Sequence, residues 1–321
     1  MNKANKIKVA VGVILLVVSL LVIFNFQTVK DFFKASSFQP SEKLLAVESS
    51  LDLTDHGKLI FRATSPSLDS RDDFNKVCSA GQSEASILGC YVADEIHVFD
   101  VESKEFSGIV ESTSAHELLH AVWMRMDDRE KSDLTPVLKS VYDSGSTEFK
   151  KTVDLYDSSA KLEEIYVRSA TQIRDLPENL EKHFSTIFKN QDSLVGFYES
   201  YISPFSELEK AINSLSEELS SLKQKIEEKT NTYASQSEAF AGKVSEFNSC
   251  ASTPNCFTNS TFSTRRAELL REQSDLNALY GSLDADISAY NQKIDVYNEK
   301  VIYGKNLQNI INSNPKPKES V

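Results

Sequence analysis

The chain has 321 residues, of which 40% are hydrophobic and 26% are charged, and its formal net charge is −12. A chain of this length can bury enough apolar surface for one or two domains with their own cores. The acidic balance argues against a nucleic-acid binder, because such a protein needs a basic surface to replace the counterions on phosphate.

The most apolar segment of the chain lies at the N-terminus. Residues 9–24 carry no charge, three lysines precede them, and no acidic residue occurs before Asp31. Such a run is typical of a signal peptide or of a membrane anchor. Residues 25–30 fit a signal-peptidase site poorly, so the pattern favours an uncleaved anchor. We therefore expect a single-pass membrane protein with residues 1–8 in the cytoplasm, a transmembrane helix over 9–26 and the remainder outside.

The four cysteines form two local pairs, Cys78 with Cys90 and Cys250 with Cys256. They do not follow the closely spaced double CxxC pattern of a zinc ribbon. In an oxidising compartment the natural bridges are those within each local pair. The alternative is four unrelated free thiols, and the exported topology favours the two disulfides.

The middle of the chain has a mixed pattern. Residues 27–50 resemble a stalk that leads into a folded domain over 51–203. Within that domain, KLIFRA at 58–63 predicts a short strand, and residues 90–101 alternate apolar and polar side chains as a strand does. Helical spacing of apolar residues follows over 109–126. Further helical patterns cover 134–156, 159–174 and 178–202. The domain is therefore predicted to be α+β and mainly α.

A different pattern begins after Pro204. Apolar residues recur four and three positions apart over 208–226, and a second seam of this kind runs over 269–301. Heptad spacing is typical of a coiled coil. The polar segment between the seams carries a proline and the second cysteine pair, so we predict an antiparallel coiled-coil hairpin over 204–312, inserted into the first domain or appended to it. The polar tail 313–321 is predicted to be disordered.

The motif that carries chemistry is HELLH, residues 116–120. On a helix, positions i and i+4 lie on one face about one turn apart, so His116 and His120 can present two imidazoles to one metal ion. Glu117 can point toward the same cleft and take a proton from a water molecule that the metal has made acidic. Amide hydrolysis needs this activated water and a Lewis acid on the carbonyl, so the motif predicts a catalytic zinc site.

The alternative interpretation of HELLH is two surface histidines on an amphipathic helix. The chain has only five histidines, so a chance HExxH is on the order of one in a hundred from composition alone. A predicted strand precedes the helix, and Ser112 or Thr113 can cap it, which is the context that a catalytic zinc helix needs. The metal-binding interpretation is therefore favoured.

Residues 85–200 resemble the zincin superfamily of metallopeptidases, most closely over 114–121, SAHELLHA. They are also similar to a group of anchored bacterial proteins with a strand, an HExLHA helix and a downstream glutamate helix. The metzincin branch is excluded, because Ala121, Val122 and Trp123 follow the motif and no third histidine extends it. The resemblance implies a zincin-like peptidase domain of the glutamate-ligand branch.

In that branch the third zinc ligand is a glutamate on a later helix, and residues 161–172 resemble this helix. Glu164 is the preferred ligand and Glu163 is the alternative. The sequence departs from the common pattern, in which an aspartate four residues further on supports a histidine, because Arg168 follows Glu164 and Val167 follows Glu163. The residue that supports the histidine is therefore left unassigned.

A zincin also needs a hydrogen-bond donor for the oxyanion of the reaction. The candidates are Tyr166, Arg168 and His183. Tyr166 is preferred as a catalytic residue, although its offset of two positions from Glu164 points it to roughly the opposite side of the helix. If neither glutamate binds metal, the next candidate ligands are Asp154, Asp157 and His183.

These observations predict a membrane-anchored metallopeptidase with Zn²⁺ as cofactor and Glu117 as general base. Its substrates would be peptides or proteins, and its coiled coil would select substrate, recruit a protein partner or self-associate. The alternative is a non-catalytic envelope scaffold or adaptor that acts through its coiled coil and has a structural or vestigial metal site. The intact Glu117 favours the enzyme. A third hypothesis, an adaptor that never bound metal, is the least favoured because the chain contains HELLH.

Overall fold

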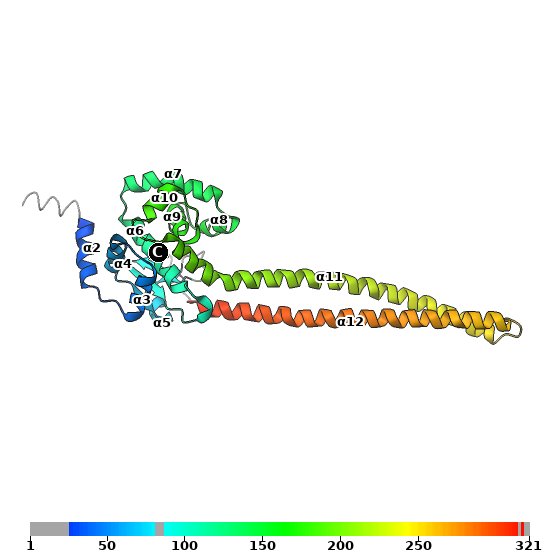
Figure 1. Ribbon diagram of the computed structural model, residues 1–321. Helices are drawn as coiled ribbons and strands as arrows, with labels where there is room; N and C mark the ends of the chain where they lie inside the picture. The colour runs from blue at the N-terminus through cyan, green and yellow to red at the C-terminus, as the bar shows by residue number, and fades with distance from the viewer. Residues whose placement is uncertain (1–25, 81–86, 314–315, 318–321) are drawn as a thin grey trace, which may run out of the picture. The chain divides into compact units, whose positions relative to one another are not determined.

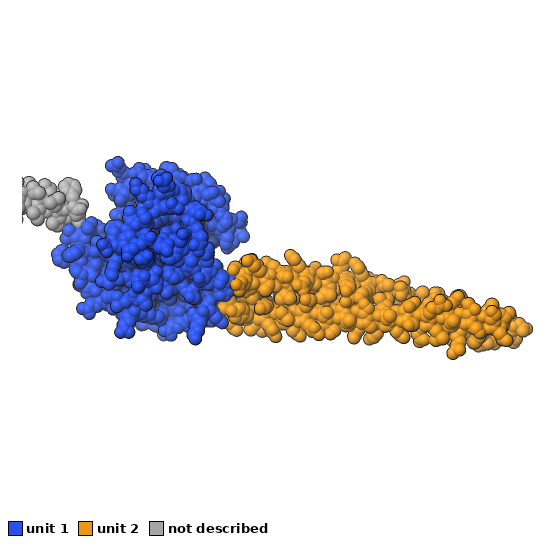
Figure 2. All heavy atoms as spheres, in the orientation of Figure 1, with its two compact units in different colours: residues 1–204, 308–321 blue, residues 205–307 orange. Residues whose placement is uncertain are grey.

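The computed structural model describes residues 26–80, 87–313 and 316–317. The chain divides into two compact units. Unit 1 contains the chain up to Pro204 together with the residues from Gln308 onward, and unit 2 contains Phe205–Leu307 (Figure 2). Unit 2 is therefore an insertion in unit 1 and not an appended domain.

The described part of unit 1 begins with three helices, α2 (Phe26–Ser37), α3 (Glu42–Ser50) and α4 (Asp55–Ala63). The predicted stalk over 27–50 is not separate from the domain, because Leu44 and Val47 of α3 are buried in its core. The predicted strand over 58–63 is a helix. Thr54 caps α4 by accepting a hydrogen bond from the Gly57 amide, and its buried residues recur at helical spacing.

A three-stranded sheet has the order β1 (Ser67–Asp69), β4 (Glu95–Phe99), β3 (Gly89–Val92). Strand β1 runs parallel to β4, and β3 runs antiparallel to it. The single strand predicted over 90–101 is therefore a hairpin. Ala93 and Asp94 form its turn with φ angles of 52° and 65°, the left-handed pair that a two-residue hairpin requires. In the chain, helix α5 (Arg71–Val77) lies between β1 and β3, and the 3₁₀ helix η1 (Lys104–Phe106) follows β4.

Helix α6 (Ile109–Arg125) carries the HELLH motif and packs against β3, β4 and α9 (Lys161–Gln172) (Figure 1). It begins after Gly108, whose φ of 85° lies in the left-handed region that favours glycine. Ser112 and Thr113, the expected caps, are buried inside the helix. Three more helices complete this part of unit 1: α7 (Asp128–Ser144), α8 (Thr147–Val153) and α10 (Glu178–Phe184).

The prediction of a transmembrane anchor is corrected by the structure. Among the described residues no helix is both long enough and apolar enough to cross a bilayer. Helix α2 has 12 residues and includes Lys30, Asp31 and Lys34, whereas a span needs about 20 predominantly apolar residues. Residues 9–25 of the predicted anchor lie outside the described part of the chain. The predicted single-pass location, with its cytoplasmic N-terminus and its membrane partner, is withdrawn.

Two long helices, α11 (Gln191–Ala251) and α12 (Asn259–Ile311), supply unit 2. Ion pairs join them, and later residues of α11 pair with earlier residues of α12, so the two helices run antiparallel. The pairs are Glu218–Lys293, Lys225–Asp286, Lys229–Asp286 and Lys243–Glu272. The structure thus contains an antiparallel pair of helices, but α11 begins at Gln191, before the predicted start of the hairpin at 204, and runs through Pro204.

Both predicted disulfides are confirmed, Cys78–Cys90 in unit 1 and Cys250–Cys256 at the tip of the hairpin. The prediction of a disordered tail is wrong for its described residues. Ser313 is fully buried, and β5 (Lys316–Pro317) pairs in parallel with β2 (Ser79–Ala80). Residues 314–315 and 318–321 of that tail lie outside the described residues.

A buried ion-pair network joins α2, the β3–β4 turn and α6. The Arg125 guanidinium donates to both carboxylate oxygens of Asp31, at 2.8 and 2.9 Å, and to Asp94 Oδ1 at 2.8 Å. It also donates to the Tyr91 hydroxyl at 3.1 Å. Asp31 is only 4% exposed, so its charge depends on Arg125 for compensation.

We expect Arg125→Met to lower the free energy of unfolding by about 3–5 kcal/mol, because it leaves the buried Asp31 carboxylate without its cationic partner. Urea unfolding of the full chain measures this loss. The double variant Asp31→Asn/Arg125→Met should lose clearly less than the sum of the two single variants. Additive losses would contradict a direct coupling between the two side chains.

Candidate metal centre

Helix α6 presents His116 and His120 on one face, as their spacing of four requires. Their Nε2 atoms lie 3.3 Å apart, and their ring centroids are 5.0 Å apart. This separation is close enough for both nitrogens to face a single metal ion. Both side chains line a cavity of about 880 Å³ in unit 1, and Glu117 between them lines the same cavity.

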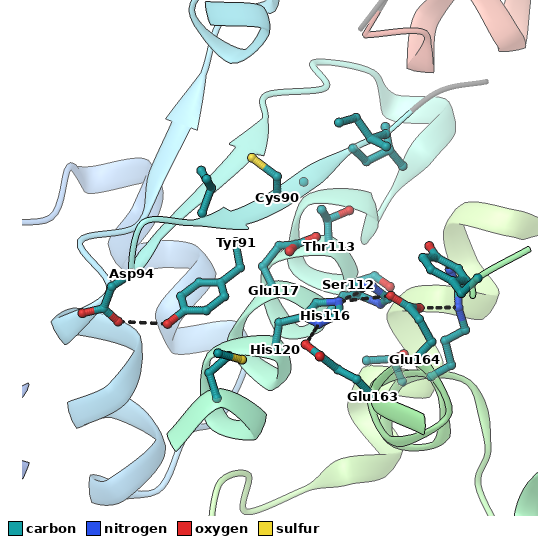
Figure 3. Close-up of a pocket in the computed structure, with 18 of the residues that line it drawn as sticks. Cys90, Tyr91, Asp94, Ser112, Thr113, His116, Glu117, His120, Glu163 and Glu164 are labelled. Carbon is teal, nitrogen blue, oxygen red and sulfur yellow. Dashed lines mark hydrogen bonds and ion pairs between the residues drawn. The ribbon is translucent and has the colours of Figure 1, made fainter. Parts of the chain in front are cut away.

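Helix α9 brings a carboxylate to the two histidines. Glu164 Oε1 lies 3.4 Å from His120 Nε2. His116, His120 and Glu164 each offer one ligand atom within 4.8 Å of the others, and within the described residues this is the one group of its kind (Figure 3). Two imidazole nitrogens and a carboxylate oxygen are donors that zinc accepts in catalytic sites, where three protein ligands leave one position open. The donor set therefore fits a zinc ion.

The neighbouring carboxylate of Glu163 faces the other nitrogen of the same histidine. Glu163 Oε1 lies 2.6 Å from His120 Nδ1. A carboxylate at Nδ1 holds the proton there, so the lone pair of Nε2 is left for a metal. Glu163 was the alternative ligand in the sequence, and in the structure it occupies the supporting position that was left unassigned. The two residues can divide these tasks because adjacent helical side chains point about 100° apart.

Arg168 engages the second oxygen of Glu164. Its Nε donates to Glu164 Oε2 at 2.9 Å, and its Nη2 donates to the Tyr156 hydroxyl at 3.2 Å. Both side chains of this ion pair are largely buried. The arginine that breaks the familiar sequence pattern therefore orients the candidate ligand, so that Oε1 faces the histidines and Oε2 faces the guanidinium.

The electrostatics of the cluster favour a positive charge at its centre. Burial lowers the pKa of His116 to about 3. Burial also disfavours the charged form of His120, but the hydrogen bonds to Glu163 and Glu164 outweigh it and raise its pKa to about 10. Burial opposes ionisation of Glu164, yet His120, His116 and Arg168 lower its pKa to about 2. The carboxylates thus stabilise a cation at the position that a metal ion would take.

Glu117 lies between α6 and strand β3, and only 6% of it is exposed. A Cβ atom on Gly89 would stand 2.6 Å from Glu117 Oε1 and 2.7 Å from the Thr113 methyl carbon. Carbon atoms do not approach an oxygen this closely, so only glycine allows β3 to pass over the glutamate. No local pattern in the sequence indicates this role of Gly89 beside Glu117.

The remaining candidates lie elsewhere. Tyr166 is fully buried, packs against Trp123 and Phe184, and forms a hydrogen bond of 2.9 Å with His183. Neither Tyr166 nor His183 lines the cavity, whereas Tyr156, Arg168, Tyr198 and Tyr201 do. The structure therefore does not bring the preferred oxyanion donor to the site. The helical offset noted in the sequence is the physical reason, because it turns Tyr166 into the core.

Searches among family models, curated proteins and solved structures found no match for this chain.

The two glutamates of α9 should differ in their effect on metal affinity. When zinc is titrated into the metal-free full chain, we expect Glu163→Gln to weaken binding about 10- to 100-fold, because it alters only the support of His120. Glu164→Gln replaces a ligand and should weaken binding more. Competition titration with a chromophoric chelator measures both affinities. Equal losses, or the reverse order, would contradict the assignment of ligand and support.

Proposed function

We propose that this protein is a zinc-dependent metallopeptidase of the zincin type that hydrolyses peptide bonds. The observation that carries the proposal is the convergence of His116, His120 and Glu164 from two helices, with Glu117 on the same cavity. Two ligands and a general base from one helix, with a glutamate from a later helix, are the parts that metal-assisted amide hydrolysis requires.

The elements around the site support a zincin-like domain. The motif helix α6 packs against β3, an antiparallel strand at the edge of the described sheet. The ligand helix α9 follows later in the chain and packs against α6, where Glu163 and Glu164 both contact His120. The heptad seams and the antiparallel pairing of α11 with α12 support a coiled coil in unit 2. Its proposed role is to recruit a protein partner or to self-associate.

The side chains divide the proposed chemistry among them. His116, His120 and Glu164 would hold a zinc ion, which would act as Lewis acid for the scissile carbonyl and lower the pKa of a water molecule. Glu117 accepts the proton of the attacking water and returns it to the leaving amine. Glu163 keeps the His120 ring in its orientation, and Arg168 does the same for the Glu164 carboxylate.

The developing charge on the carbonyl oxygen also needs a donor. Tyr156 and Arg168 line the cavity and are joined by a hydrogen bond, so this pair replaces Tyr166 as the proposed source. The Arg168 guanidinium lies near the Tyr156 ring, 5.7 Å from its centroid. A cation beside a phenol strengthens the hydroxyl as a hydrogen-bond donor. A peptide carbonyl in the cavity would then meet both a metal ion and a polarised hydroxyl.

We expect Glu117→Gln to retain about one zinc ion per chain and to lower kcat by about 10²- to 10⁴-fold, because the amide keeps the size of the side chain but cannot accept the proton. Hydrolysis of a fluorogenic peptide library and metal analysis of the same samples measure the two effects. Glu111→Gln is the control, since Glu111 lies on the same helix and does not line the cavity. A chelator should abolish activity, and added zinc should restore it.

If Glu117→Gln hydrolyses a substrate of the parent at the parent's rate, the proposed mechanism fails. The alternative is a non-catalytic scaffold with a structural metal site. It predicts about one zinc ion per chain and no metal-dependent hydrolysis in the parent, which the same two measurements distinguish.

A further inference from the structure

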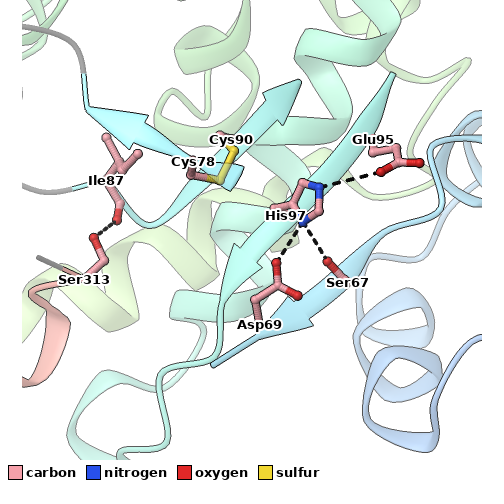
Figure 4. Close-up of a disulfide and its surroundings, with 8 residues drawn as sticks. All are labelled: Ser67, Asp69, Cys78, Ile87, Cys90, Glu95, His97 and Ser313. Atoms are coloured by element: carbon pink, nitrogen blue, oxygen red, sulfur yellow. Dashed lines mark hydrogen bonds and ion pairs between the residues drawn. A yellow bond between two sulfur atoms is a disulfide. The ribbon is translucent and has the colours of Figure 1, made fainter. Parts of the chain in front are cut away.

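The end of helix α12 and the residues after it belong to unit 1, where they contact the region before strand β3. The Arg71 guanidinium donates to the Asn309 carbonyl at 3.3 Å, and the Asn75 side-chain amide donates to the Ser313 carbonyl at 2.7 Å. The Ser313 hydroxyl donates to the Ile87 carbonyl at 2.5 Å (Figure 4). These hydrogen bonds join the short segment 309–313 to two parts of the chain that are distant in sequence, α5 and the residues just before β3.

The contacts of this segment are buried. Ser313 is fully buried, and so is Cys78, which bridges to Cys90 in β3. The segment continues into β5, which pairs in parallel with β2 directly after Cys78. A buried hydroxyl bonded to a backbone carbonyl fixes the position of that carbonyl, because leaving either group without a partner is costly.

The Ile87 carbonyl, which Ser313 holds, lies two residues before Gly89, the residue that approaches Glu117. Ile87 precedes Leu88 and Gly89, and all three line the cavity. Gly89 is the residue whose missing side chain makes room for the Glu117 carboxylate. A shift of Ile87 would therefore move the backbone that forms one wall around Glu117. Leu88 is held on the other side by the amide of Phe99, at 2.8 Å.

We propose that residues 309–313 act as a positioning strap for the cavity, and that Ser313 is a positioning residue for Glu117. This inference rests on the proposed function. Ser313 fixes Ile87, Ile87 sets where Gly89 crosses α6, and Gly89 limits where the Glu117 carboxylate can lie. The strap follows unit 2 in the chain, and the bond from Ser313 to Ile87 joins it to the cavity wall.

The test compares Ser313→Ala and Asn75→Ala with the parent full chain. Both variants remove one hydrogen bond of the strap and leave every candidate ligand in place. We expect kcat to fall roughly 10- to 100-fold, because small displacements of a catalytic group cost about this much. KM and zinc content should stay unchanged, and hydrogen exchange of the amides over 88–92 should become faster. Ser313→Thr, which keeps the hydroxyl, should recover kcat at least in part.

Ser263→Ala is the matched control, since this exposed hydroxyl of α12 also donates to a backbone carbonyl, that of Asn259. It should change neither kcat nor exchange over 88–92. Unchanged kcat in both strap variants, or a parallel loss of zinc, would overturn the proposal. If the parent itself hydrolyses nothing, the proposed function fails, and the strap is then judged by exchange alone. Faster exchange over 88–92 supports it, and unchanged exchange refutes it.

Discussion

The candidate site depends on the orientation of one imidazole ring, that of His120. Its Nδ1 atom faces Glu163, and its Nε2 atom faces both Glu164 and His116. A pair of neighbouring glutamates can straddle one ring because their side chains leave the helix about 100° apart. A rotation of the ring would break both carboxylate contacts together. The arrangement therefore requires α6 and α9 to stay in register with each other.

The register of these two helices is set by aromatic packing next to the site. Tyr166 of α9 packs against Trp123 of α6 with ring centroids 5.1 Å apart, and against Phe184 at the same distance. Burial raises the pKa of Tyr166 well above its ordinary value, so its hydroxyl stays neutral and bonds to His183. Aromatic pairs of this kind contribute beyond their buried area. Tyr166 thus serves the site by packing, two residues away from the candidate ligand.

Sequence patterns predicted the parts of the site that local geometry determines. The spacing of HELLH places His116 and His120 on one face, and the resemblance to zincins pointed to Glu164. The roles of Glu163 and Gly89 depend on contacts between segments that are distant in the chain, so no periodicity indicates them. KLIFRA is a short apolar run, and such runs suit a strand or a helix equally until packing decides. The pairing of β5 with β2 also joins segments that are distant in the chain. The polar composition of the tail gave no indication of it, so the tail was predicted to be disordered.

Strand β3 shows why these non-local contacts bear on the proposed chemistry. It is a short edge strand that pairs with β4 alone among the described strands, so fewer backbone hydrogen bonds restrain it than restrain a central strand. The Cys78–Cys90 disulfide restrains this strand directly, and the bond from Ser313 to Ile87 restrains the segment just before it. With β3 held in this way, the absence of a side chain at Gly89 leaves Glu117 a narrow space against α6. In the proposed mechanism, a general base confined to that space would lose little freedom when a substrate binds, so less of the binding energy would be needed to orient it.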